Sequence, residues 1–306
     1  MSKNKKNEIL LETGTNELEV MEFTIADRHF GINVAKVVEI MQSTAVNPMP
    51  NANPYIEGIF KPRDTIMTVV NLPMYLNLQS SQSSERDIFI ITSFNQTNSA
   101  FRVNTVEAIH RISWSAIEKP DEAIYGGGDG VATGIARFDG RLITIIDFEK
   151  IIADINPKTT IQIGEVERMP ERVEFTAPIM IAEDSVFLEQ LIVDALTAAN
   201  YTNIIRCSNG QEAWNKLNAF KELGTDIAQH CACLITDIEM PQMDGHRLIK
   251  LIRGDSYLQV LPCIIFSSLI NEEMMRKGIS IGATAQISKP EIGQLVGIID
   301  KYAIRI

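Results

Sequence analysis

The sequence has no run of about 18 apolar residues, the length that a membrane-spanning helix requires, so we expect no direct insertion into a membrane. Basic residues are also scarce: 28 Lys and Arg stand against 39 Asp and Glu, which gives a formal net charge of −11. Contacts with nucleic-acid phosphates need a basic face, so this charge argues against a general nucleic-acid-binding protein. The lysines near the N-terminus are not followed by the apolar segment of a secretory signal. We therefore expect a cytoplasmic protein that does not bind nucleic acid and does not insert into a membrane.

Cysteine and histidine are too few and too scattered for the common zinc motifs. The four cysteines are Cys207, Cys231, Cys233 and Cys263, and the one C-x-C pair has no second pair or histidine at zinc-finger spacing. A thiol within an apolar, strand-like run usually behaves as a small buried apolar group. We expect reduced cysteines, as in a cytoplasmic compartment.

A length of 306 residues suggests two domains, each large enough for its own core. The boundary contains Asn156-Pro157 and Met169-Pro170, with charged residues and no apolar period. We predict a disordered tail over residues 1–16, a first domain over 17–155, a linker over 156–176 and a second domain over 177–306.

The first domain is predicted to be all-β. Short runs rich in Ile, Val, Phe and Thr are separated by turn residues. The expected strands cover 21–25, 28–32, 66–70, 87–92, 99–103 and 142–146, and short helical segments are expected at 34–41, 72–76 and 147–153. Many short strands at close spacing favour a closed or nearly closed barrel, because closure removes unpaired edges.

The second domain alternates short apolar runs with amphipathic stretches. The expected strands cover 179–182, 204–207, 232–236, 263–266 and 285–287, and the expected helices cover 186–199, 212–220, 245–252, 271–279 and 292–302. Five such repeats within about 125 residues predict a doubly wound α/β domain around a parallel sheet.

Five polar residues follow these apolar runs, at the strand ends where a parallel sheet places its ligand-binding loops. Glu183 and Asp184 follow the first run, Asp237 the third, Ser267 the fourth and Lys289 the fifth. Three carboxylates in one pocket are unfavourable unless a cation neutralises them, and hard oxygen ligands select Mg²⁺. Asp237 can attack a phosphoryl donor and become an aspartyl phosphate, while the hydroxyl and the ammonium contact phosphoryl oxygens. The sequence therefore predicts a magnesium-dependent phosphoacceptor site.

Residues 178–306 resemble a response-regulator receiver domain. In that resemblance Glu183-Asp184 is the acidic pair, Asp237 the phosphoacceptor, Ser267 the hydroxyl position and Lys289-Pro290 the lysine with its following proline. The resemblance implies a (βα)5 fold and a bound Mg²⁺.

Two further positions follow from the same resemblance. It implies that Glu239 contributes its backbone carbonyl to the metal site. Three residues before the lysine, where relatives carry an aromatic switch residue, this chain has Gln286. We expect the coupling between the hydroxyl and this position to differ from that of relatives.

The first domain resembles the CheW-like chemotaxis adaptor family in three stretches, residues 23–40, 55–72 and 132–148. The resemblance implies two small β-barrel subdomains. It also implies binding to the cytoplasmic tip of chemoreceptors and to the regulatory domain of the chemotaxis histidine kinase. Arg63 matches a family arginine near that contact surface, and Glu39 is a second candidate.

An adaptor joined in this order to a receiver resembles the CheV-type coupling proteins. The implied function is a non-enzymatic coupling of chemoreceptors to the kinase, tuned by phosphorylation of Asp237, in association with membrane receptor arrays through protein contacts. Few residues follow Pro290, so the output is expected in the first domain. One alternative is a receiver that serves as a phosphate sink for the kinase. Another is a magnesium-dependent phosphohydrolase of the haloacid dehalogenase type, which needs an Asp where this chain has Glu239.

Overall fold

The structure is a computed structural model that describes residues 17–63, 65–78, 86–94, 97–118, 130–157, 161, 164, 166, 169–170, 172–270 and 272–303. The chain divides into two compact units, and the division falls between Thr159 and Thr160. The tail expected over residues 1–16 lies outside the described residues.

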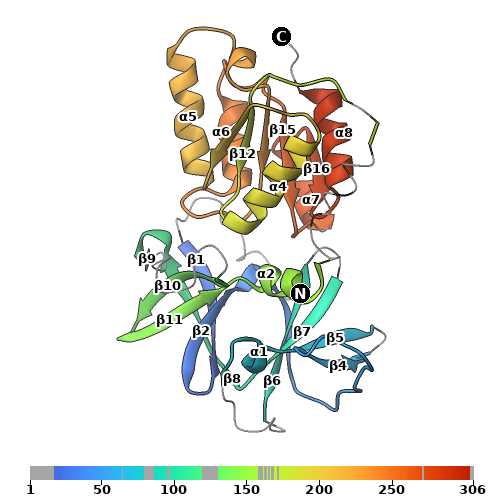
Figure 1. The fold of residues 1–306 in the computed structure, drawn as a ribbon. Coiled ribbons are helices and arrows are strands. Elements are labelled where there is room, and N and C mark those ends of the chain that lie inside the picture. The colour runs from blue at the N-terminus through green and yellow to red at the C-terminus, as the bar shows by residue number, and fades with distance from the viewer. Residues whose placement is uncertain are drawn as a thin grey trace, which may run out of the picture. The chain divides into compact units, whose positions relative to one another are not determined.

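The N-terminal unit consists of two β-sheets with short helices, coloured blue to light green in Figure 1. A six-stranded sheet has the order β8-β1-β2-β11-β10-β9, and a five-stranded sheet has the order β3-β6-β7-β5-β4. The strands are β1 (Glu17–Ile25), β2 (Arg28–Asn33), β3 (Val37–Gln42), β4 (Ile56–Phe60), β5 (Met67–Asn71), β6 (Ile88–Phe94), β7 (Thr97–Val103), β8 (Thr105–Ser113), β9 (Ile117–Glu118), β10 (Ala132–Phe138) and β11 (Arg141–Ile146). The helices are α1 (Leu72–Tyr75) and α2 (Phe148–Ile155), with 3-10 turns at Val34–Lys36 and Trp114–Ala116. The β-rich fold expected for this half is confirmed.

The helix expected at residues 34–41 is wrong. Only Val34–Lys36 forms a 3-10 turn, and the rest is strand β3, paired antiparallel with β6. The run Val37, Val38 and Ile40 is β-branched, and such side chains lose rotamer freedom in a helix but pack well on a pleated sheet. Tertiary pairing therefore decides the structure of this segment.

The packing of the N-terminal unit follows from strands that are apolar on both faces. One face of β1 carries Leu18 and Val20, which pack with Ile143 inside the six-stranded sheet. The other face carries Met21 and Phe23, in a cluster that also includes side chains of the five-stranded sheet and α2. A third cluster, around Phe60 and Phe89, belongs to the five-stranded sheet. Each sheet thus has its own core, and the cluster that contains Met21 and Phe23 joins the two sheets.

A buried carboxylate interrupts the apolar face of β1. Glu22 is 0% exposed, and its Oε2 lies 2.5 Å from His110 Nε2. Its Oε1 lies 2.7 Å from His29 Nδ1 and 3.5 Å from Arg141 Nη1. Burial alone would raise the pKa of Glu22, but the hydrogen bond with His110, the charge of Arg141 and the close contact with His29 outweigh it, so the pKa is lowered from its ordinary value.

We predict that Glu22→Gln destabilises the N-terminal unit by about 2–4 kcal/mol at pH 7, because it removes the partner of buried polar groups. A carboxyl whose pKa is lowered on folding stabilises the fold above its unfolded-state pKa, near 4.5 here. That stabilisation is lost as the pH falls through the lower folded-state value, so variant and wild type should converge in acid. Urea unfolding at several pH values, followed by Trp114 fluorescence in a Trp214→Phe background, measures this.

The matched control is Glu19→Gln on the same strand, whose carboxylate pairs with Arg111 at a half-exposed site. Its expected effect is below about 1 kcal/mol. An equal loss in the free energy of unfolding for the two variants would contradict a special role for Glu22.

The C-terminal unit is a five-stranded parallel sheet with the order β13-β12-β14-β15-β16. Its strands are β12 (Ile179–Ala182), β13 (Ile204–Cys207), β14 (Cys233–Thr236), β15 (Cys263–Ser267) and β16 (Ala285–Ser288). Its helices are α4 (Val186–Ala198), α5 (Gly210–Glu222), α6 (Gly245–Gly254), α7 (Glu272–Ser280) and α8 (Ile292–Tyr302), with a 3-10 turn at Ile227–Gln229. The predicted doubly wound α/β fold is confirmed.

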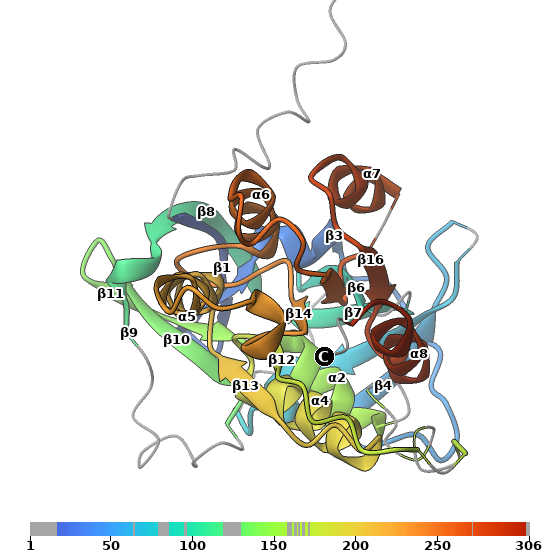
Figure 2. The same cartoon turned by 90° about the horizontal axis from the view of Figure 1, so that it is seen from above.

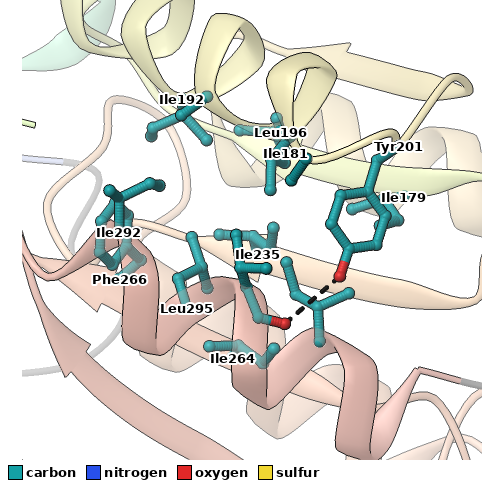
Figure 3. Close-up of a cluster of buried hydrophobic side chains, with 14 of the residues drawn as sticks. Ile179, Ile181, Ile192, Leu196, Tyr201, Ile235, Ile264, Phe266, Ile292 and Leu295 are labelled. Carbon is teal, nitrogen blue, oxygen red and sulfur yellow. Dashed lines mark hydrogen bonds between the residues drawn. The ribbon is translucent and has the colours of Figure 1, made fainter. Parts of the chain in front are cut away.

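Helices cover both faces of this sheet, as Figure 2 shows for α4 and α8 opposite α5 and α6. On one face, Leu196 of α4 and Leu295 of α8 pack on Ile181 and Ile235 of the sheet (Figure 3). The other face buries side chains of α5 and α6, together with three of the cysteines. All four cysteines are reduced and buried. The three central strands, β12, β14 and β15, are buried along their whole length, so their polar residues are confined to the carboxyl ends.

None of the helices among the described residues is long and apolar enough to cross a membrane.

Candidate phosphorylation and metal site

The carboxyl ends of β12 and β14 lie side by side because these strands pair in parallel, with Ala182 opposite Thr236. Glu183 and Asp237 are the next residues on each strand. The backbone N–H of Asp237 donates to the carbonyl of Ala182 at 2.9 Å, so the ladder continues to the first acidic residue. The parallel sheet therefore brings the two carboxylates to one edge.

Lys289 follows β16 and reaches both of these carboxylates. Its Nζ donates to Glu183 Oε2 at 2.7 Å and to Asp237 Oδ2 at 2.9 Å. Lys289 and Glu183 are each 2% exposed, and Asp237 is 8% exposed. One ammonium thus bridges two carboxylates in a site largely closed to water.

The second oxygen of each carboxylate accepts a backbone hydrogen bond. Asp237 Oδ1 accepts from the N–H of Ile238 at 2.6 Å, and Glu183 Oε1 accepts from the N–H of Ser185 at 3.3 Å. The loop after Asp237 also packs closely on the start of α6: a Cβ on Gly245 would lie 2.0 Å from the Asp237 carbonyl oxygen. Any larger residue at position 245 would collide with the Asp237 backbone, so glycine is required there. The close contact holds the Asp237 loop in place.

The electrostatics of the site favour a cation. Burial raises the pKa of Glu183 well above its ordinary value. The neighbouring carboxylates Asp237 and Asp184 raise it further, and Lys289 opposes them. A single ammonium therefore does not fully compensate three carboxylates.

These residues fit a hard divalent cation. Glu183, Asp184 and Asp237 each offer a carboxylate oxygen, and the three oxygens lie within 4.8 Å of one another. Asp184 is exposed, so one side of the cluster is open to solvent. Oxygen donors with an open side are typical of Mg²⁺ sites, where the ion keeps several waters.

The hydroxyl and the switch position lie on neighbouring strands. Ser267, at the end of β15, is 1% exposed, and its Oγ accepts from the N–H of Leu269 at 3.4 Å. Gln286, in β16, packs against α7: its Nε2 donates to the carbonyl of Met275 at 2.8 Å, and a Cβ on Gly278 would lie 2.2 Å from its Oε1. Ser267 thus belongs to the carboxyl edge, whereas the Gln286 side chain occupies a notch that a glycine leaves in the helix.

The remaining predicted positions are placed as follows. Glu239 lies two residues after Asp237 and is half-buried. Arg63 and Glu39 belong to the N-terminal unit, where Arg63 Nη2 contacts Glu39 Oε1 at 3.0 Å. The Arg63 side chain is 82% exposed, so this pair is accessible on the surface of that unit.

Sequence reasoning missed the two glycines that shape this site. Gly245 supports the Asp237 loop, and Gly278 receives Gln286. For Gly278 the available signal was a glycine inside a helical pattern, because it lowers helix stability unless another group needs the space.

Comparisons with known proteins match both units. The CheW-like domain family matches residues 19–156, and the response regulator receiver domain family matches residues 179–300. The chemotaxis protein CheV3 of Helicobacter pylori is 27% identical over 90% of this chain and 91% of its own length. CheV2 of the same organism is 23% identical over 89% of each chain. The chemotaxis protein CheW of Thermotoga maritima is 26% identical over 48% of this chain and 96% of its own length.

The two domain matches cover the two compact units in the order adaptor then receiver, and the CheV relatives align across both. This architecture is that of a coupling adaptor with a phosphorylatable receiver domain, which fits a role other than catalysis. The chain therefore consists of a CheW-like domain joined to a response regulator receiver domain, and it is similar over most of its length to the CheV chemotaxis proteins.

Proposed function

We propose that this protein couples chemoreceptors to the chemotaxis histidine kinase, and that phosphorylation of Asp237 changes the strength of that coupling. The observation that carries the proposal is the placement of Asp237 beside Lys289 and Glu183, in a chain whose other unit is CheW-like. The receiver would be the input and the CheW-like domain the output.

The chemical step is phosphoryl transfer from a phosphohistidine of the kinase. A carboxylate oxygen of Asp237 attacks phosphorus, a P–O bond forms, and the P–N bond breaks. The electron pair of the broken bond stays on the histidine nitrogen, so the product is an acyl phosphate. The Lys289 ammonium lies 2.9 Å from the attacking carboxylate and is placed to balance the charge gained by Asp237. Ser267 is the proposed hydroxyl donor to a phosphoryl oxygen.

Glu183, Asp184 and Asp237 would hold Mg²⁺, with Glu239 contributing its backbone carbonyl. When bound, Mg²⁺ supplies positive charge to the phosphoryl oxygens. The burial of Glu183 and Lys289 excludes most water from the base of this site. That burial keeps the charge interactions strong.

The proposed partners are the cytoplasmic tip of a chemoreceptor and the regulatory domain of the kinase. The likeness to CheW proteins supports both, and both would place the protein at receptor arrays in the cytoplasm. Arg63 and Glu39 are proposed as part of the contact surface. Their ion pair is exposed, and such pairs contribute below about 1 kcal/mol to folding. A role in binding is therefore compatible with their small role in stability.

A phosphate sink is the second candidate, since a receiver that only drains the kinase needs the same site. The hydrolase alternative is less well supported, because Glu239 stands where the general acid of such an enzyme would be Asp.

Reconstituted receptor and kinase distinguish coupling from a sink. We expect treatment of the protein with acetyl phosphate and Mg²⁺ to change receptor-dependent kinase autophosphorylation by about fivefold, a typical allosteric coupling. The Asp237→Asn variant, treated in the same way, should leave the rate of kinase autophosphorylation unchanged. If the treated wild type also leaves it unchanged but still removes phosphoryl groups from the kinase, the sink is correct and tuned coupling is not.

A further inference from the structure

The described residues of the chain between the two matched domains include apolar side chains that pack onto the receiver. Residues 157–178 lie outside both family matches, yet Ile161 and Val166 are each only 3% exposed. Both belong to the apolar cluster that contains Leu196 of α4 and Val296 of α8. We call the described residues from Ile161 to Thr176 the docked segment.

The end of the docked segment pairs with the turn that follows α4. The N–H of Phe175 donates to the carbonyl of Asn200 at 2.8 Å, and the N–H of Thr202 donates to the carbonyl of Phe175 at 3.2 Å. The ring of Phe175 lies edge-on to Tyr201, with centroids 5.4 Å apart. This pairing is strand-like and begins before the first receiver strand.

Arg172 connects the docked segment to α8. Its Nη2 donates to Asp300 Oδ1 at 2.5 Å and to the Tyr201 hydroxyl at 3.0 Å, and its Nε donates to the carbonyl of Ala199 at 3.0 Å. The Tyr201 hydroxyl also donates to Asp300 Oδ1 at 2.8 Å. In Figure 3 the ring of Tyr201 points from the turn after α4 toward the last helix. Burial and the Asp300 carboxylate raise the pKa of Tyr201, so its hydroxyl remains a donor.

We propose that Arg172, Tyr201 and Asp300 form an intramolecular clamp that fastens the docked segment to α8. While the clamp is closed, Ile155 at the end of α2 and Ile161 on the receiver are six residues apart in the chain. Six residues reach about 20 Å at full extension, whereas the 22 residues from Ile155 to Ala177 would reach about 75 Å. The clamp therefore limits how far the receiver can move from the CheW-like unit, and it connects the last receiver helix to the chain that leads there.

Hydrogen exchange of the full chain tests the clamp. Arg172→Met keeps the aliphatic stem and Asp300→Asn keeps the side-chain size, and each removes one side of the ion pair. Each should speed exchange in residues 172–176 by about 10-fold, while β12 stays as protected as in the wild type. The double variant should exchange no faster than the faster single variant, because the two residues act on one contact.

Arg276→Met is the matched control, since Arg276 lies in α7 and pairs only at the surface with Glu272. Unchanged exchange in both clamp variants, or an equal increase in the control, would overturn the clamp.

Distances between the units test the tether. The native cysteines are buried, so spin labels can be attached at introduced Arg137→Cys and Leu223→Cys, one exposed site on each unit. The distance distribution should be at least about twofold broader in Arg172→Met than in the wild type. Equal widths would show that the clamp does not limit the tether. Neither readout uses phosphorylation or the kinase, so failure here leaves the proposed function untouched.

Discussion

Asp237→Asn is expected to take up label from phosphorylated kinase about 100-fold more slowly than the wild type, or not at all, in the presence of Mg²⁺. An amide lacks the nucleophilic oxygen that forms the acyl phosphate. The substitution keeps size and shape, and the amide oxygen can still accept one hydrogen bond from Lys289 or from the N–H of Ile238. Loss of label would therefore report on chemistry rather than on unfolding, and near-UV circular dichroism checks that the fold is kept.

The matched control is Asp194→Asn, an exposed carboxylate on α4 that accepts a hydrogen bond from Gln190. It should take up label at the wild-type rate. Chelation of Mg²⁺ should slow the uptake of label by the wild type and by the control alike, because both keep the three carboxylates. Label on Asp237→Asn at the wild-type rate would remove Asp237 as the phosphoacceptor and would leave Asp184 as the next candidate.

The receiver fold was predictable because its three central strands, β12, β14 and β15, are buried along their whole length and the two edge strands are also short and mostly apolar. Such strands appear in the sequence as short apolar runs, and three predicted elements, Ile179–Ala182, Ile204–Cys207 and Ile292–Tyr302, have the boundaries that the structure shows. The strands of the N-terminal unit are harder to read. β8 (Thr105–Ser113) was not expected, and most of its residues are exposed, so it has no apolar run. In that sheet, hydrogen bonding to neighbouring strands determines where a strand forms more than the composition of the segment does.

The positions of the site residues followed from one rule, that polar residues after parallel strands share an edge. Their contacts did not follow from it. That Lys289 bridges Glu183 and Asp237, and that Gln286 turns toward α7, depend on side-chain packing between distant elements. The docked segment has no apolar period of its own. Its Arg172 contacts Tyr201 and Asp300, which are remote in sequence, and the sequence indicated only a linker.

Lys289→Met is expected to destabilise the C-terminal unit by about 3 kcal/mol or more at neutral pH without Mg²⁺. It removes the one cation between two buried carboxylates, and an unpaired buried charge is strongly unfavourable. Burial already raises the pKa of Glu183, and Lys289 is the group that opposes this rise. A carboxyl whose pKa is raised on folding stabilises the fold below its unfolded-state pKa and loses that contribution as the pH rises through the folded-state value. The loss caused by Lys289→Met should therefore grow from pH 5 to pH 8.

Mg²⁺ should reverse much of this loss, because Glu183, Asp184 and Asp237 are also its proposed ligands. Without the ammonium the site has more uncompensated negative charge, so added Mg²⁺ should stabilise Lys289→Met more than the wild type. Urea unfolding with MgCl₂ or EDTA, followed by Trp214 fluorescence in a Trp114→Phe background, separates these effects from the N-terminal unit. Lys250→Met, an exposed position on α6, is the control and should behave as the wild type. If Mg²⁺ stabilises the wild type and Lys289→Met equally, the lysine and the metal do not share the carboxylates, and the proposed ligand set is wrong.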